Sequence, residues 1–167
     1  PKPSALIGTA CHAIAEDFIL ERNDEDLSVK RDGKDNYRAI VRPALPTLLR
    51  QRAAVRAGTG FVEREMKRVL RNGVPIIGRI DFIDLANPEE PLVDDHKNTK
   101  DLKYAKSEEE LKSNIQMLAY AYEATVLAPK AKTVRVAHSV CRTEGAPAHR
   151  YTDAVLTRAD ITAGWSR

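Results

Sequence analysis

The stretch "VPIIGRIDFIDLANPEEPLVDDHKNTK", residues 74–100, predicts two β-strands joined by a turn. Its first part, 74–85, alternates apolar residues with other residues at a period of two, which is typical of a strand with one buried face. The turn-rich segment "ANPEE" then leads into a second strand at 91–97. This second strand ends in two aspartates and a lysine, and burying such charges without partners would be costly.

The regions on both sides of this stretch extend the pattern. The segment "FVEREMKRVL", 61–70, predicts a strand that forms a hairpin with 74–85 across "RNG". Ser107 and Glu110 match a capping box and begin a helix predicted at 107–125. Its apolar residues recur at helical spacing, at Leu111, Ile115, Leu118 and Tyr122. Further elements are helices at 5–20, with Ser4 as N-cap, and 47–56, and strands at 133–140 and 149–156.

The order of these elements is a helix, three strands, a helix and one or two further strands. It predicts an α/β fold in which a central mixed β-sheet is flanked by helices. The helix between the third and fourth strands predicts that a later strand runs parallel to an earlier one. With 167 residues, we expect a single domain over 1–167 with a polar insert around 22–43. Because the chain starts at Pro1, we also expect it to be part of a longer protein.

Composition narrows the class of protein. The hydrophobic fraction of 43% is ordinary for a globular domain, and no apolar run is long enough to predict a membrane span. Cys11 and Cys141 lack the spacing of a metal-binding pair, so we expect a reduced, intracellular protein. We also expect it to be cytoplasmic and encoded by a bacterium or phage. The net charge of +3 is compatible with a nucleic-acid partner.

Strand alternation predicts which charged side chains meet. Asp81 lies off the apolar face of its strand, and Asp95 and Lys97 share one face of the next strand, opposite Asp94 and His96. A register that places Asp81 beside Asp95 would bring together two carboxylates, which repel each other unless a cation relieves them. Mg²⁺ or Mn²⁺ would do so and would suit phosphodiester hydrolysis. The alternative is a solvated strand edge with a weak surface ion pair.

Four motifs occur in a fixed order: "GTACHAIAE", "GRIDFID", "DDHKNTK" and "QMLAY". Together they resemble the PD-(D/E)XK nuclease superfamily, and specifically its RecB-like exonuclease branch, to which the CRISPR adaptation exonucleases are also similar. The resemblance implies a restriction-endonuclease-like core. It also implies a metal-dependent deoxyribonuclease, an exonuclease acting in DNA repair, recombination, phage or defence.

The resemblance also implies roles for individual residues. Lys97 would be catalytic together with Asp95 and Asp81, and Gln116 and Tyr120 would lie beside the site. The implied metal ligands are His12, Asp81, Asp95 and the backbone carbonyl of His96. Taken alone, a helical histidine such as His12 is more often a structural residue, here bonded to Glu16, and Gln116 and Tyr120 are equally compatible with ordinary helix packing.

Other charged residues are candidates by position. Glu16 shares a helix face with His12, and Lys112 shares one with Gln116 and Tyr120. Arg79 lies on the same strand face as Asp81, and Glu63 and Glu65 are secondary candidates on the preceding strand. Several basic residues are candidates for phosphate contacts, and solvated surface charge is the alternative for them: Arg50, Arg52, Arg56, Lys100, Lys103 and Lys106.

The expected cofactor is one or two Mg²⁺ or Mn²⁺ ions. An iron–sulfur cluster, which some relatives carry, is not expected within these residues, because only Cys141 lies in the C-terminal part. The expected partner is DNA, single-stranded or at duplex ends, with a helicase or another repair or defence protein as a further candidate and no membrane. A second hypothesis is a catalytically idle module with the nuclease fold that binds nucleic acid or serves as a scaffold.

Overall fold

The computed structural model describes residues 3–22, 37–69 and 73–165. The five strands of the described chain are β1 (Gly60–Val69), β2 (Pro75–Asp84), β3 (Leu92–Thr99), β4 (Thr133–Arg142) and β5 (His149–Thr157). The helices are α1 (Pro3–Ile19), α2 (Tyr37–Val41), η1 (Arg42–Ala44), α3 (Leu45–Arg56), η2 (Leu102–Tyr104), α4 (Glu108–Lys112), α5 (Ile115–Leu127) and α6 (Arg158–Trp165). No helix within these ranges is long and apolar enough to cross a membrane.

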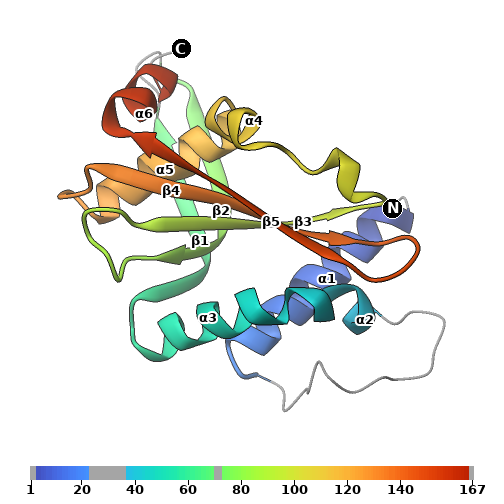
Figure 1. The fold of residues 1–167 in the computed structure, drawn as a ribbon. Coiled ribbons are helices and arrows are strands. Elements are labelled where there is room, and N and C mark those ends of the chain that lie inside the picture. Colours follow the sequence, from blue (N-terminus) through green and yellow to red (C-terminus); the bar gives the residue numbers. More distant parts are fainter. Residues whose placement is uncertain (1–2, 23–36, 70–72, 166–167) are drawn as a thin grey trace.

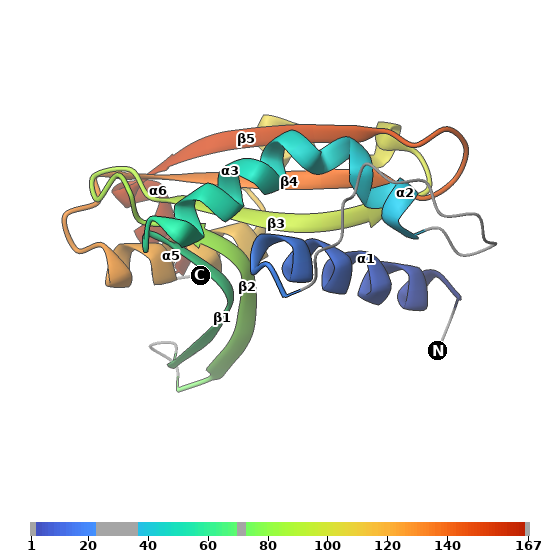
Figure 2. The ribbon, with the colours of Figure 1, turned by 90° about the horizontal axis from the view of Figure 1, so that it is seen from below.

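The strands form one mixed sheet in the order β1-β2-β3-β4-β5 (Figure 1). β3 and β4 run parallel, joined by α4 and α5, and the other neighbouring pairs are antiparallel. Figures 1 and 2 show α1–α3 on one side of the sheet and α4–α6 on the other. The predicted α/β fold and its parallel crossover are therefore confirmed.

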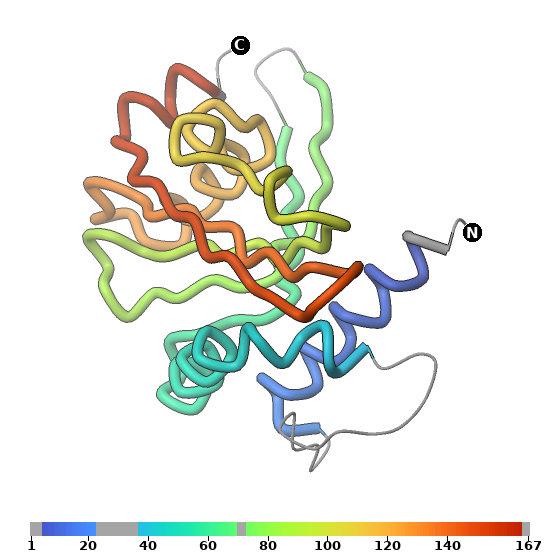
Figure 3. The backbone as a smooth tube through the Cα atoms, turned by 45° about the vertical axis from the view of Figure 1, so that its right-hand side comes forward, coloured from blue at the N-terminus to red at the C-terminus, as the bar shows by residue number. Residues whose placement is uncertain are grey.

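Each face of the sheet has its own apolar core. Ile80, Val93 and Met117 belong to the core beneath α5 and α6, while Cys11 and Leu48 belong to the core beneath α1–α3. β4 lies between β3 and β5 and contains several β-branched residues, and most of its side chains are buried, on both faces of the sheet. Figure 3 traces the chain from α1 to α6, which lie at opposite sides of the molecule. The sheet is thus held from both faces, which fixes the position of β3.

The pairing of β2 with β3 is short and ends in a fork. The ladder contains three pairs and stops at Phe82 and Asp94. Beyond it β2 curves away together with β1 (Figure 2), while β3 stays paired with β4 as far as Thr99. At the fork, the residues of β2 and β3 no longer pair with each other, and α1 runs beside the fork. Asp81 and Asp95 are the first residues after the last pair on their strands.

The helix predicted at 107–125 is wrong in one respect, because the chain forms two helices there. The predicted capping box at Ser107 and Glu110 is present at the start of α4. Asn114, however, has an extended ψ of 120°, and its side chain accepts hydrogen bonds from the backbone of Gln116 and Met117. The asparagine therefore starts a new helix, and Ile115, expected on the apolar face, is 72% exposed.

We expect Asn114→Ala to lower the free energy of unfolding by about 1 kcal/mol, because two amide groups at the start of α5 lose their acceptor. Urea denaturation followed by circular dichroism measures this loss. Ser113→Ala is the matched control, since the exposed Ser113 hydroxyl only donates to carbonyls of its own helix. Equal stability of both variants would contradict the capping role.

Two smaller details differ from the sequence prediction, and a third lies largely outside the described residues. α1 begins at Pro3, so Ser4 lies inside the helix, and its buried face includes Cys11, Ala15 and Phe18, while Leu6 is 53% exposed. α6 was not predicted, although Thr157 and Asp160 bond reciprocally at its start, as a capping motif does. Of the expected insert at 22–43, residues 23–36 lie outside the described ranges and the rest includes α2.

Candidate active site

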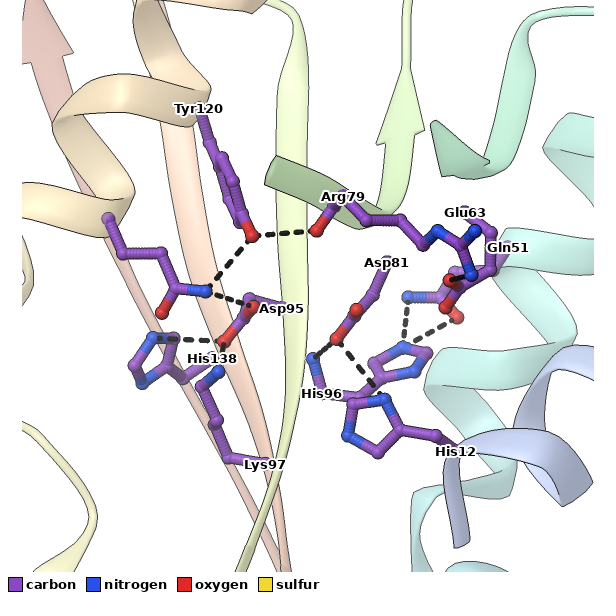
Figure 4. A network of polar contacts seen from close by, with 11 residues as sticks. His12, Gln51, Glu63, Arg79, Asp81, Asp95, His96, Lys97, Tyr120 and His138 are labelled. Carbon is purple, nitrogen blue, oxygen red and sulfur yellow. Dashed lines mark hydrogen bonds and ion pairs between the residues drawn. The ribbon is translucent and has the colours of Figure 1, made fainter. Parts of the chain in front are cut away.

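Asp81 lies at the fork between β2 and β3. The backbone N–H of His96 donates to Asp81 Oδ2 over 2.7 Å, so the carboxylate takes an amide that the ladder leaves without a strand partner. His12 Nδ1, on α1, lies 3.7 Å from the same oxygen. The Asp81 side chain is only 12% exposed, against 34% for His12. α1 therefore supplies a nitrogen donor to a nearly buried carboxylate (Figure 4).

Glu63 completes a group with His12 and Asp81. Each of the three offers a donor atom, and these atoms all lie within 4.8 Å of one another. Glu63 has a left-handed φ of 51°, unusual for a residue with a side chain, and lies between two regular pairs of the β1–β2 ladder. Its Oε2 accepts from Arg79 Nη1 over 3.3 Å. A strained backbone at such a position is a common property of functional sites.

An open groove of about 400 Å³ gives access to this group. It is lined by Gly8, Thr9, His12, Ala13, Glu16, Glu63 and Asp81. The groove thus runs between α1 and the β1–β2 hairpin. A substrate phosphate could approach His12, Glu63 and Asp81 from there without any rearrangement of the sheet.

A second polar group is centred on Asp95, on the opposite face of β3 from Asp94. Lys97 Nζ lies 2.6 Å from Asp95 Oδ2, and His138 Nε2, on β4, lies 3.5 Å from the same oxygen. Gln116 Nε2 donates to Asp95 Oδ1 over 3.3 Å. Asp95 and His138 are almost fully buried, whereas the Lys97 side chain is 39% exposed. Lys97 is therefore the member of this group that solvent and substrate can reach.

α5 is tied to the fork through Tyr120. The Tyr120 hydroxyl donates to the Arg79 carbonyl over 2.6 Å and accepts from Gln116 Nε2 over 3.0 Å. Gly78 lies next to Arg79 on β2, and a Cβ there would be in ordinary contact with the Tyr120 ring, at 3.4 Å. Gln116 and Tyr120 thus connect Asp95 to the curved part of β2.

The other face of β3 carries a buried polar network. Gln51 Nε2, on α3, donates to Asp94 Oδ2 over 2.9 Å, and Ser139 Oγ donates to the same oxygen over 3.0 Å. His96 Nε2 lies 3.1 Å from Gln51 Oε1 and 3.0 Å from its Nε2. The His96 ring packs edge-on against the His12 ring, with centroids 6.2 Å apart. The Asp94 carboxylate is thus hydrogen-bonded to side chains of α3 and β4.

Burial and neighbouring charge set the protonation of this region. Burial, and then the charge of Asp95, raise the pKa of Asp81 to about 6, against the opposing effect of His12. Burial raises the pKa of Asp94 to about 7, although its hydrogen bond from Ser139 opposes this. Burial, and then the neighbouring His12, lower the pKa of His96 to about 3. Near neutral pH, His96 is therefore neutral, and Asp81 is an anion whose ionisation lowers the stability of the folded protein.

The residues present at the fork fit a hard divalent cation. His12, Glu63 and Asp81 provide one nitrogen and two carboxylates, a donor set that Mg²⁺ and Mn²⁺ accept. A cation there would also relieve the repulsion between Asp81 and Asp95 that raises the pKa of Asp81. Asp95 does not belong to the 4.8 Å group, because Lys97 and His138 contact it instead.

Several predicted site residues have other partners. Glu16 lines the groove, but its carboxylate pairs with Arg22 at 2.8 Å and not with His12. Three others form exposed ion pairs away from the fork, namely Glu65 with Lys67, Lys100 with Glu144 and Lys112 with Glu108. Among the other basic candidates, Arg52 and Arg56 pair with Glu21, Lys103 with Asp101, and Arg50 lies over the Tyr151 ring.

Sequence reasoning missed His138 and Gln51. His138 lies in a strand that also carries Arg135 and Ser139, so the sequence does not single it out, and its contact with Asp95 depends on the register of β3 with β4. Gln51 lies within a predicted helix, and it is 3% exposed. Helical spacing alone does not show that this amide turns towards β3.

Comparison with known proteins adds to this geometry. A family model described as the PD-(D/E)XK nuclease superfamily matches residues 1–163. The chain belongs to the PD-(D/E)XK nuclease superfamily. The match confirms the superfamily that the four motifs indicate but not the RecB-like branch, and nucleases of this superfamily generally use divalent metal ions.

No curated protein matches the PD-(D/E)XK chain. Among solved structures, one described as "Crystal structure of SSO0001" is 16% identical, with a TM-score of 0.38. The alignment covers 90% of this chain and 83% of that chain.

Proposed function

We propose that this protein is a Mg²⁺- or Mn²⁺-dependent deoxyribonuclease of the RecB-like branch that hydrolyses DNA phosphodiester bonds as an exonuclease. One observation carries the proposal: the fork of a PD-(D/E)XK chain places His12, Glu63 and Asp81 beside Asp95 and Lys97. A bound cation would polarise a phosphoryl oxygen and acidify a water molecule. The DNA preference and the RecB-like assignment rest on the sequence motifs.

Each group has a defined role in this proposal. His12, Glu63 and Asp81 hold the cation, with Asp95 and the His96 carbonyl as the further ligands that the motifs imply. Lys97, the exposed member of the Asp95 group, orients the attacking water and offsets the negative charge that develops on phosphorus. Gln116 and His138 hold the Asp95 carboxylate, and Tyr120 holds the curved part of β2.

Arg79 has a place in the same scheme. Its guanidinium is 61% exposed and lies 3.3 Å from Glu63, at the edge of the group that would hold the cation. When Glu63 binds a cation, Arg79 is available for a phosphate of the substrate strand. Arg79 therefore belongs with the substrate contacts of the proposed enzyme. A helicase or another repair or defence protein would supply DNA ends to this enzyme.

The proposal is tested with end-labelled single-stranded and duplex DNA. We expect cleavage with Mn²⁺ or Mg²⁺, no cleavage with EDTA, and resistance of a covalently closed circle if the enzyme is an exonuclease. Nicking of the circle would replace the exonuclease assignment by an endonuclease. An inert protein that still binds DNA would instead favour a catalytically idle binding or scaffolding module.

A further inference from the structure

We propose that Gln51 is a positioning residue that acts through His96 on His12 and Asp81, and so on the affinity of the fork for a divalent cation. The inference rests on the proposed function, because it concerns the same cation site. Gln51 lies on α3, away from the groove, and none of the sequence motifs includes it. Its influence is therefore argued from its contacts alone.

The first step is the rigidity of Gln51. Its side chain is 3% exposed, and its Nε2 donates to Asp94, which is 1% exposed. Ser139 holds the same carboxylate oxygen from β4. A buried amide with such a partner has one preferred rotamer, because any other rotamer would leave a buried carboxylate oxygen with one donor fewer.

The second step is the orientation of His96. Gln51 Nε2 donates one hydrogen to Asp94, and the amide meets His96 Nε2 with its Oε1 at 3.1 Å and with its Nε2 at 3.0 Å. It accepts from one ring tautomer or donates its second hydrogen to the other, and either bond fixes the plane of the His96 ring. Without the amide, the ring could rotate about its side-chain torsions within the space lined by Leu48 and Cys141.

The third step connects His96 to the cation site. The backbone N–H of His96 donates to Asp81 Oδ2, and the His96 ring packs edge-on against the His12 ring. His96 thus touches two of the three residues whose donor atoms converge at the fork. A hydrogen-bonding partner behind a ligand typically changes metal affinity about 10- to 100-fold when it is removed.

The test compares Gln51→Leu and Gln51→Asn with wild type in the full chain, using Mn²⁺ binding by calorimetry. Leucine removes the amide, and asparagine keeps it but is one methylene shorter and cannot reach both partners. We expect about 10-fold weaker Mn²⁺ binding in both variants. On DNA we expect a lower kcat at subsaturating Mn²⁺ that recovers towards the wild-type value at saturating Mn²⁺, whereas a general loss of folding would lower kcat at every Mn²⁺ concentration.

Val55→Ala is the matched control, since Val55 lies one turn further along α3 and packs only on the apolar core. We expect it to lower the melting temperature without changing the Mn²⁺ affinity. Nitrogen NMR of the metal-free protein gives an independent readout, in which the tautomer that His96 adopts in wild type is no longer held in Gln51→Leu.

The outcomes separate the two proposals. Folded Gln51 variants that bind Mn²⁺ as tightly as wild type, or that keep the His96 tautomer, overturn the role of Gln51. A wild-type protein that binds no Mn²⁺ and cuts no DNA overturns the proposed function, while the NMR comparison still decides whether Gln51 orients His96. Weaker binding in both Gln51 variants, with normal binding by Val55→Ala, supports the inference.

Discussion

Lys97→Met is expected to lower the single-turnover rate of DNA cleavage by about 10³-fold while leaving Mn²⁺ affinity within a few-fold of wild type. The reason is the position of the ammonium: it is 2.6 Å from Asp95 but outside the group formed by His12, Glu63 and Asp81. It is also the exposed member of the Asp95 group, so it can reach water and phosphate. The measurement pairs quenched-flow cleavage at saturating Mn²⁺ with calorimetry.

Lys100→Met is the matched control for this variant. Lys100 lies three residues downstream, is 71% exposed and pairs with Glu144, so its loss removes the same charge from the same region of the chain. We expect less than a threefold effect on the rate. Lys97→Met leaves the Asp95 carboxylate with His138 and Gln116 as its partners, so the melting temperature of this variant is measured as well. Lys97→Arg keeps the positive charge but changes its geometry, and so separates the two contributions. Cleavage by folded Lys97→Met at near the wild-type rate would remove Lys97 from the mechanism.

The two faces of β3 could be predicted because strand periodicity is local. A period of two separates Asp95 and Lys97 from Asp94 and His96 whatever the tertiary fold, and the contacts follow this division: Lys97 meets Asp95 on one face, and Gln51 joins Asp94 and His96 on the other. The sheet also follows from local signals, since the three-strand run and the crossover helix leave few topologies.

The group around Asp81 depends on features that sequence patterns do not encode. Glu63 lies opposite Asp81 in the β1–β2 register, but regular alternation would not reveal its left-handed φ of 51°. His138 meets Asp95 through a parallel pairing between strands about 40 residues apart in sequence. The fork itself arises where β2 curves away, so Asp81 takes the amide of His96 in place of a strand partner.

The break at Asn114 shows a different limit. The apolar spacing from Leu111 to Tyr122 continues through it, so periodicity predicts one helix. The competing signal is the side chain of Asn114, which accepts from the amides of Gln116 and Met117 and favours an extended backbone at Asn114. Gln116 lies two residues after this cap, and it is the residue that donates to Asp95. The break therefore sets the position of a site residue as well as the course of the helix.

Asp81→Asn is expected to abolish Mn²⁺ binding and cleavage and, without metal, to make the protein more stable at neutral pH. Burial and the charge of Asp95 raise the pKa of Asp81 from 3.8 to about 6. A raised pKa means that the stability contributed by this carboxyl is complete below 3.8 and is lost as pH rises through about 6. Asparagine avoids that loss, which is about 3 kcal/mol at pH 7.5, and can still accept from His96.

Urea denaturation at pH 4.5 and pH 7.5, with EDTA and with Mn²⁺, measures both effects of Asp81→Asn. With EDTA we expect the variant to exceed wild type at pH 7.5 and to approach it at pH 4.5, and with Mn²⁺ only wild type should gain stability. Glu65→Gln is the control, because it removes an exposed carboxylate of β1 that pairs with Lys67. A variant that is less stable than wild type at pH 7.5 in EDTA would contradict the strained carboxylate. Gain in stability with loss of function at one residue is the result expected where a carboxylate is buried to hold a cation and not to support the fold.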